Sequence, residues 1–174
     1  MFSLYSKQKF SSSSLLTMAY HHKITGQVEF SETDMAGIVH FSNFFRYMER
    51  AEASFFRELG FPLVYIGNDE TRGWPRVRAN ASFQAPLYFE EEFEVHLYIK
   101  AIKIRAIEFF FRINKLEKNS KIQVAKGGFT TVYVRRDPDS MDMNPIQLPA
   151  ELLNKLEECP QESMNPIRNV PRND

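Results

Sequence analysis

Several features are scarce or missing in this chain of 174 residues, and each shortage narrows what the protein can be. Its single cysteine, Cys159, has no partner for an intrachain disulfide, which favours a reducing compartment and a cytoplasmic location. The 22 basic and 22 acidic side chains leave no net charge, which argues against a nucleic-acid binder. A local basic patch for a small phosphorylated ligand stays open. No apolar run approaches the ~20 residues of a membrane-spanning helix, and we find no internal repeat.

Both ends of the chain are expected to be tails around one domain of ordinary size. Residues 1–20 contain a run of four serines and few charges, and we expect a flexible segment there. A targeting segment is the alternative, although a secretory signal would need a longer apolar core. Residues 160–174 are rich in proline and asparagine and predict a second flexible tail. The predicted domain therefore covers residues 21–159.

Aromatic residues are abundant, with 16 Phe and 7 Tyr, and many of them recur at helical spacing in one segment. Residues 43–59 place eight apolar side chains, six of them aromatic or methionine, on one broad arc. We predict a long helix with Ser42 as its N-cap and Gly60 as its stop, embedded against a sheet. Glu52 falls within the apolar arc. It either extends to solvent at the rim of the arc, or pairs with a basic group, or serves as a second catalytic carboxylate.

Period-two alternation of apolar residues predicts strands on both sides of this helix. A short helix beginning with Pro149 is expected to close the domain, over residues 149–158. The order of one strand, one long helix and four antiparallel strands indicates an α+β architecture, with a sheet of about five strands curled around the helix. The unpaired edges of such a sheet favour dimerisation. The predicted strands cover residues 24–30, 77–83, 93–99, 109–113 and 131–134, with a hairpin turn at 117–120.

Asp34 stands in a turn between the first strand and the long helix, close to Gly37. A carboxylate that faces a helix N-terminus can attack, or activate water to attack, a carbonyl group that the free amides of the helix polarise. Aspartate also favours turns for structural reasons alone, so this pattern leaves a purely structural role open.

Several short segments in and after this turn carry a resemblance to a known family: Val28–Phe30, Thr33–Asp34, Gly37–His40, Ser42–Phe44, Tyr47–Ala51, Pro75–Val77 and Asn80–Phe83. They resemble the hotdog-fold acyl-CoA thioesterases of the 4-hydroxybenzoyl-CoA thioesterase and YbgC-like type. The resemblance covers about residues 24–136 and is strongest in the Asp–Gly–His–Asn block that opens the helix. It implies a hotdog fold, hydrolysis of an acyl-CoA thioester to a free acid and coenzyme A, an active site at a dimer interface, and neither a metal nor another cofactor. The implied assembly is a homodimer or homotetramer, and acyl carrier protein is a further potential partner.

The resemblance also implies roles for individual residues. Asp34 would be the general base or the nucleophile, and the backbone amide near Phe41 would polarise the thioester oxygen. His40 would orient Asp34 or line the pocket, unless it only bonds backbone near the helix start. Phe41 stands where many YbgC-like members have a second histidine, which leaves the subgroup open. The implied substrate contacts are Gly37, Val39, Asn43, Lys103 and Arg105.

Lys103 and Arg105 would hold the phosphates of coenzyme A, which need several charge-assisted contacts. Ile104 interrupts the basic run of the family at this point, and a solvated surface is the alternative. Two other functions remain open at this stage. One is a hotdog dehydratase acting on 3-hydroxyacyl thioesters, and the other is a non-catalytic protein that binds acyl thioesters or acyl carrier protein.

Overall fold

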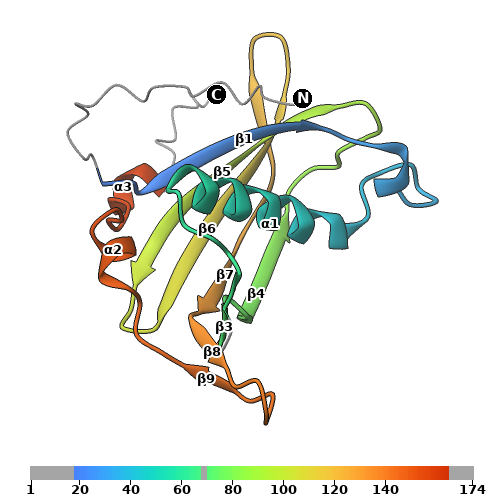
Figure 1. The fold of residues 1–174 in the computed structure, drawn as a ribbon. Coiled ribbons are helices and arrows are strands. Elements are labelled where there is room, and N and C mark those ends of the chain that lie inside the picture. The colour runs from blue at the N-terminus through green and yellow to red at the C-terminus, as the bar shows by residue number, and fades with distance from the viewer. Residues whose placement is uncertain (1–17, 68–69, 165–174) are drawn as a thin grey trace, which may run out of the picture.

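A five-stranded antiparallel sheet with one long helix across it forms the body of the protein (Figure 1). The structure is a computed structural model that describes residues 18–67 and 70–164. The helix α1 (Phe41–Glu58) covers one face of the sheet. The prediction of an α+β fold with about five strands around one long helix is therefore confirmed. In spatial order the strands are β1 (His21–Gln27), β5 (Glu92–Ile102), β6 (Ala106–Leu116), β7 (Lys121–Val132) and β4 (Arg76–Phe83).

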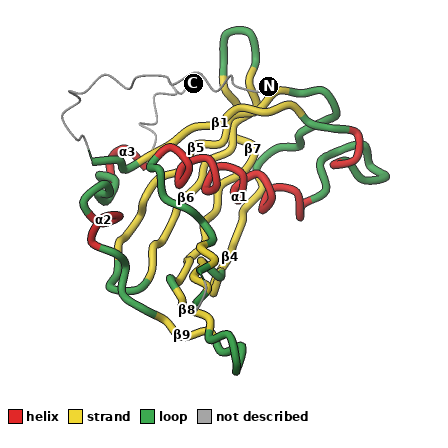
Figure 2. The backbone as a smooth tube through the Cα atoms, in the orientation of Figure 1, coloured by secondary structure: helices red, strands yellow, loops and turns green. Residues whose placement is uncertain are grey.

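A second, smaller sheet of four short strands lies beyond the end of β7 (Figure 2). Two of its strands precede β7 in the chain and two come after it. The predicted strand over residues 131–134 is in fact divided between two sheets, because β7 ends at Val132 and the next strand starts at Val134. The predicted turn at 117–120 is confirmed, since the amide of Glu117 donates to the carbonyl of Ser120 at 3.0 Å. In spatial order the small sheet contains β2 (Tyr65–Ile66), β3 (Thr71–Gly73), β8 (Val134–Arg136) and β9 (Met143–Pro145).

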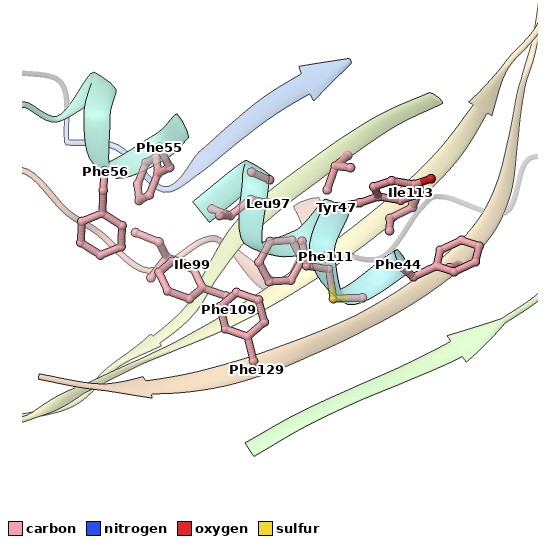
Figure 3. Close-up of a cluster of buried hydrophobic side chains, with 14 of the residues drawn as sticks. Phe44, Tyr47, Phe55, Phe56, Leu97, Ile99, Phe109, Phe111, Ile113 and Phe129 are labelled. Carbon is pink, nitrogen blue, oxygen red and sulfur yellow. The ribbon is translucent and has the colours of Figure 1, made fainter. Parts of the chain in front are cut away.

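The buried face of α1 supplies one side of the core (Figure 3). Tyr47 is fully buried, and its ring stacks on that of Phe93 in β5 with centroids 4.3 Å apart. Each large apolar side chain buried in this way contributes about 1.5–3 kcal/mol relative to an exposed one. The aromatic arc read from the sequence is thus confirmed as the buried side of the helix. Its buried apolar members are Phe44, Tyr47, Met48, Ala51, Phe55 and Phe56.

The start of α1 differs from the prediction by two residues. His40, in extended conformation, is the N-cap, and its carbonyl accepts the amide hydrogen of Asn43 at 2.9 Å. Ser42 is already helical, so its assignment as N-cap was wrong. The predicted stop is confirmed: Gly60 has a φ of +67°, and the amide of Phe61 donates back to the carbonyl of Phe56 at 2.9 Å, a Schellman closure.

The first strand also ends earlier than predicted. β1 stops at Gln27, and Phe30, assigned to the inward face of a strand, lies in the 3-10 helix η1 (Phe30–Glu32) with 76% of its surface exposed. A capping box explains the turn, because Glu29 and Glu32 bind each other's backbone amides. These local hydrogen bonds bend the chain away from the sheet.

The chain ends with two short helices. α2 (Ala150–Leu153) is shorter than the predicted helix, and Pro149 is its N-cap rather than its first residue. α3 (Gln161–Met164) lies within the segment that was predicted to be a tail. At the other end of the chain, residues 18–20 were also predicted to be part of a tail, but Ala19 forms a bridge with Leu156. Residues 1–17 and 165–174, on which the other tail predictions fall, lie outside the described part of the chain.

Candidate active site

Asp34 lies in a tight turn whose backbone closes on itself. Its amide donates to the carbonyl of Ile38 at 2.9 Å, and its own carbonyl accepts the amide of Gly37 at 2.9 Å. Gly37 has a φ of +75°, a conformation that L-residues adopt at a cost. One carboxylate oxygen of Asp34, Oδ1, accepts the amide of Ala36 at 2.8 Å. The other, Oδ2, accepts no hydrogen bond from the described residues.

The turn folds back onto the beginning of α1, so that Asp34 and the helix start share one cleft. Thr33 pairs with Val39 across the turn, and the amide of His40 donates to the carbonyl of Glu32 at 2.9 Å. The cleft has a volume of about 730 Å³. Backbone amides in the first turn of a helix have no partner within the helix and carry its positive dipole end. The lining residues are Phe30, Ser31, Thr33, Asp34, Met35, Gly37, His40 and Asn43.

His40 and Phe41 mark the entrance to α1. The Nδ1 atom of His40 lies 2.8 Å from the hydroxyl oxygen of Ser42, and its ring packs against Phe41 with centroids 4.5 Å apart. His40 lines the cleft beside Asp34, but the hydrogen bond of its ring goes to Ser42. Phe41 is 59% exposed. It is the first residue of α1, so its backbone amide has no acceptor within the helix.

Of the other residues predicted to contact substrate, two line the cleft and one belongs to the core. Gly37 and Asn43 line the cleft, but the Nδ2 atom of Asn43 already donates to the carbonyl of Glu32 at 2.7 Å. The side chain of Val39 is 4% exposed and belongs to the core, not to the cleft lining. The side-chain amide of Asn43 thus joins α1 to Glu32, and the side chain of Val39 packs in the core.

Lys103 and Arg105 are not brought to the cleft of their own chain. They follow the end of β5, whereas Asp34 follows the end of β1, which pairs with the beginning of β5 through Gln27 and Glu92. Since β5 has 11 residues, the two ends lie roughly 30 Å apart. Lys103 instead forms an ion pair with Glu108.

Glu52 is the second carboxylate that the sequence singled out. It is 1% exposed and forms an ion pair with Arg76 of β4, which confirms the assignment to a basic partner. Burial raises the pKa of Glu52 to about 7, against the opposing effect of Arg76. The guanidinium of Arg76 also lies 3.2 Å from Glu49 and 4.7 Å above the ring of Phe129. Glu52 is not part of the cleft lining, so the structure gives no support to a catalytic role.

Glu32 has a buried carboxylate behind the cleft that was not predicted from the sequence. It is 7% exposed, and its Oε2 atom accepts the hydroxyl of Tyr47 at 2.8 Å and the amide of Glu29 at 2.9 Å. Burial and this hydrogen bond raise the pKa of Tyr47, which therefore remains a donor. Two signals were present in the sequence: the Glu29–Glu32 spacing of a capping box, and the only hydroxyl on the apolar arc of α1.

Two further properties concern the described residues as a whole. In residues 18–67 and 70–164, no three His, Cys, Asp or Glu side chains are grouped so that they could hold a metal ion. Within the same ranges, no helix is both long and apolar enough to cross a membrane.

The sequence of this chain is similar to those of known proteins. The sequence profile of the thioesterase-like superfamily matches residues 28–156. A protein of Aquifex aeolicus (strain VF5), described as a candidate esterase, is 32% identical over 134 residues, which cover 76% of this chain and 94% of that protein. The 4-hydroxybenzoyl-CoA thioesterase of Pseudomonas sp. (strain CBS-3) is 24% identical over 136 residues, covering 73% of this chain and 91% of the enzyme.

Solved structures show the same fold. The 4-hydroxybenzoyl-CoA thioesterase of Pseudomonas sp. strain CBS-3 superposes with a TM-score of 0.67 at 20% identity, covering 78% of this chain and 98% of that one. A 1,4-dihydroxy-2-naphthoyl-CoA thioesterase from Synechocystis gives a TM-score of 0.64 at 21% identity, with 78% and 95% covered. These likenesses establish the hotdog fold.

Proposed function

Since the chain belongs to the thioesterase-like superfamily, we propose that it hydrolyses acyl-CoA thioesters to a free acid and coenzyme A. The observation that supports this most directly is the shared cleft, in which the carboxylate of Asp34 stands beside the first turn of α1. A base and a set of polarising amides at one place are what thioester hydrolysis requires.

In the proposed reaction, the thioester oxygen faces the free amides at Phe41 and Ser42. These amides stabilise the negative charge that develops on that oxygen as the carbonyl carbon is attacked. Asp34 acts through Oδ2 in one of two ways. As a base it removes a proton from water, and the resulting hydroxide adds to the carbon; as a nucleophile it adds itself and forms an anhydride that water then cleaves. In both cases the C–S bond breaks and the thiolate of coenzyme A leaves.

The described chain leaves a surface that a second copy would cover. β4 is the outermost strand of the large sheet, next to β7 only, and its unpaired edge is a template for another strand. Val77 and Phe83 of β4 are 65% and 47% exposed, and Phe30 and Phe41 beside the cleft are similarly open. We therefore include a homodimer or homotetramer in the proposal, with the cleft closed by the partner. Sedimentation of the wild type and of Val77→Asp tests this, because a charge at the interface should produce monomers.

Assembly also bears on the proposed phosphate contacts. Lys103 and Arg105 follow one end of β5, whereas the Asp34 turn follows the strand paired with its other end, so we expect them to reach the same coenzyme A only from another copy. If they do, Lys103→Ala should raise KM for acyl-CoA and leave the turnover of a pantetheine thioester unchanged. Acyl carrier protein as an alternative thioester donor is tested by the same comparison, with the acyl group on that protein.

The main test is a thiol-release assay across aliphatic, hydroxylated and aromatic acyl-CoAs, with wild type, Asp34→Asn and Asp139→Asn. Asp139 is an exposed aspartate between β8 and β9, so its variant controls for the charge change. We expect kcat to fall by about 10²-fold or more in Asp34→Asn, the contribution of a positioned base, and to be unchanged in the control. Binding of acyl-CoA without thiol release by the wild type would contradict the proposal, as would an enoyl chromophore without free thiol.

A further inference from the structure

Glu32 connects the Asp34 turn to α1 at three points. Its carbonyl accepts the amide of His40 at 2.9 Å and the Nδ2 atom of Asn43 at 2.7 Å, and its carboxylate accepts the hydroxyl of Tyr47 at 2.8 Å. The three donors are separated by three and four residues, so they lie on one side of successive helical turns. Glu32 is therefore attached along the first two turns of α1, and Asp34 follows it by only two residues.

The side-chain part of this connection is buried and rigidly placed. Glu32 is 7% exposed and Tyr47 is fully buried, with its ring stacked on Phe93. A hydrogen bond to a buried carboxylate is stronger than one between neutral groups, and leaving such a carboxylate without its donor is costly. Packing therefore holds the Tyr47 hydroxyl in place, and the hydroxyl in turn holds the end of η1.

The cleft itself has few restraints of this kind. The described contacts of the Asp34 side chain are limited to the local amide of Ala36. Its turn is closed by short-range backbone hydrogen bonds and by the bridge between Thr33 and Val39. On the side after the turn, Ile38 forms a bridge with Tyr88, and the amide of Val39 donates to the carbonyl of Leu87 at 2.8 Å. The position of the carboxylate relative to the amides at Phe41 and Ser42 thus depends on anchors on both sides of the turn, and on the side before it the anchor is the attachment of Glu32 to α1.

We propose that Glu32 and Tyr47 are positioning residues that hold the carboxylate of Asp34 against the N-terminus of α1. The inference rests on the proposed function, in which Asp34 acts on a carbonyl polarised by that N-terminus. Neither side chain touches the substrate. Their link sets the separation between base and amides, on which the rate of the chemical step depends steeply, since displacements of about 1 Å can cost 10²-fold in rate.

The test compares Tyr47→Phe with Tyr98→Phe. Both tyrosines are buried, and both hydroxyls are hydrogen-bonded, but Tyr98 of β5 bonds to His96 and is not among the residues lining the cleft. We expect Tyr47→Phe to lower kcat about tenfold with little change in KM, because one hydrogen bond of the link is lost while the ring stays in place. Tyr98→Phe should retain the wild-type kcat. Urea unfolding of each variant checks that the chains remain folded.

Glu32→Gln and Glu32→Ala separate hydrogen bonding from charge. Both hydrogen bonds to the Glu32 carboxylate use the same oxygen, Oε2, which the carbonyl oxygen of glutamine can replace. Glu32→Gln should therefore keep most of kcat, whereas Glu32→Ala should lose at least as much as Tyr47→Phe. Equal losses in the two Glu32 variants would overturn the proposal, because charge rather than hydrogen bonding would then be the cause.

Amide hydrogen exchange at Asp34 and Gly37 supplies a readout that does not depend on activity, since both amides donate within the turn. Exchange at these two amides should be faster in Tyr47→Phe than in Tyr98→Phe. Unchanged exchange, or faster exchange with wild-type kcat, would overturn the proposal. Failure of the proposed function would look different: Asp34→Asn would retain full thiol release, while the exchange comparison would still report on the link.

Discussion

Each half of α1 takes part in its own group of hydrogen-bonded polar side chains. At its beginning, a buried network of Glu32, Asn43 and Tyr47 lies behind an open cleft in which Asp34 is exposed. Near its end, His22 of β1 lies between two residues of α1: its Nε2 atom is 2.9 Å from the hydroxyl oxygen of Ser54, and its Nδ1 atom is 2.9 Å from the carboxylate of Glu58. The second arrangement has the order of groups found in serine hydrolase triads.

The difference between the two halves lies in the backbone, not in the side chains. Ser54 is inside α1, where each amide donates to the carbonyl four residues before it, so no free amides adjoin the hydroxyl to stabilise an oxyanion. At Phe41 the amides have no partner within the helix. We therefore expect that side chains in hydrogen-bonding order are not sufficient for hydrolysis. We interpret the Ser54–His22–Glu58 group as a link between β1 and α1, and the beginning of the helix as the site of chemistry.

The largest expected effect is a loss of kcat, and it tests the proposed site at the beginning of α1. Asp34→Asn should lower kcat by about 10²-fold or more and leave the free energy of unfolding within about 1 kcal/mol of wild type. The reason is that the Asp34 side chain is exposed and bonds only a local amide among the described residues. Thiol release and urea unfolding measured on one preparation provide both numbers. A variant that loses stability and activity together would show that Asp34 has a structural role as well.

Substitutions around the second half of α1 should instead change the free energy of unfolding. Arg76→Ala leaves the buried carboxylate of Glu52 without its cation, and we expect a loss of about 2–3 kcal/mol at pH 8, below the full value for a buried pair because Arg76 is itself 32% exposed. Arg78→Ala is the matched control on the same strand. Its side chain lines the groove on the sheet face opposite α1 and has no described ion pair. Equal unfolding free energies for the two variants would argue against a stabilising ion pair.

The buried carboxyl of Glu52 should also make the stability of the protein depend on pH. Burial raises the pKa of Glu52 to about 7 in the folded chain, from an ordinary value of 4.5. Between these values the folded chain keeps a proton that the unfolded chain has lost, so the contribution of this group to stability is present at low pH and is lost as pH rises through about 7. Relative to Glu52→Gln, the wild type should lose about 1–3 kcal/mol between pH 5 and pH 8. Urea unfolding at the two pH values measures this, and parallel curves would mean an unshifted carboxyl.

The features that could be predicted from sequence are those encoded by neighbouring residues. The aromatic arc of α1 follows from its period, the Asp34 turn from its composition, and the helix stop from Gly60. Where a local alternative competed, as with the capping box that ends β1 before Phe30, alternation alone misled. The short strands of the small sheet have two or three residues each, too few to show a period.

The parts of the site that escaped prediction depend on long-range pairing. The hydrogen bond between Tyr47 and Glu32 joins residues 15 positions apart. The capping-box spacing of Glu32 and the hydroxyl of Tyr47 on the apolar arc each mark one partner, but neither signal shows that the two residues meet. The separation of Lys103 from Asp34 follows from the antiparallel pairing of β1 with β5, which no single segment reveals. Val39 is apolar and next to the cleft in sequence, yet its amide bonds to Leu87 and its side chain turns into the core.

The smallest expected effect would decide how the second polar group is interpreted. Ser54→Ala removes one partly exposed hydrogen bond, so it should lower the free energy of unfolding by about 1 kcal/mol or less and leave kcat unchanged. A fluorophosphonate reagent should not label Ser54 in the wild type, because burial lowers the pKa of His22 while no free amides are present to stabilise the adduct. Labelling that is lost in His22→Ala would reverse this interpretation. Hydrogen-bond order along a helix would then be enough to activate a hydroxyl, and the contrast between the two halves of α1 would no longer hold.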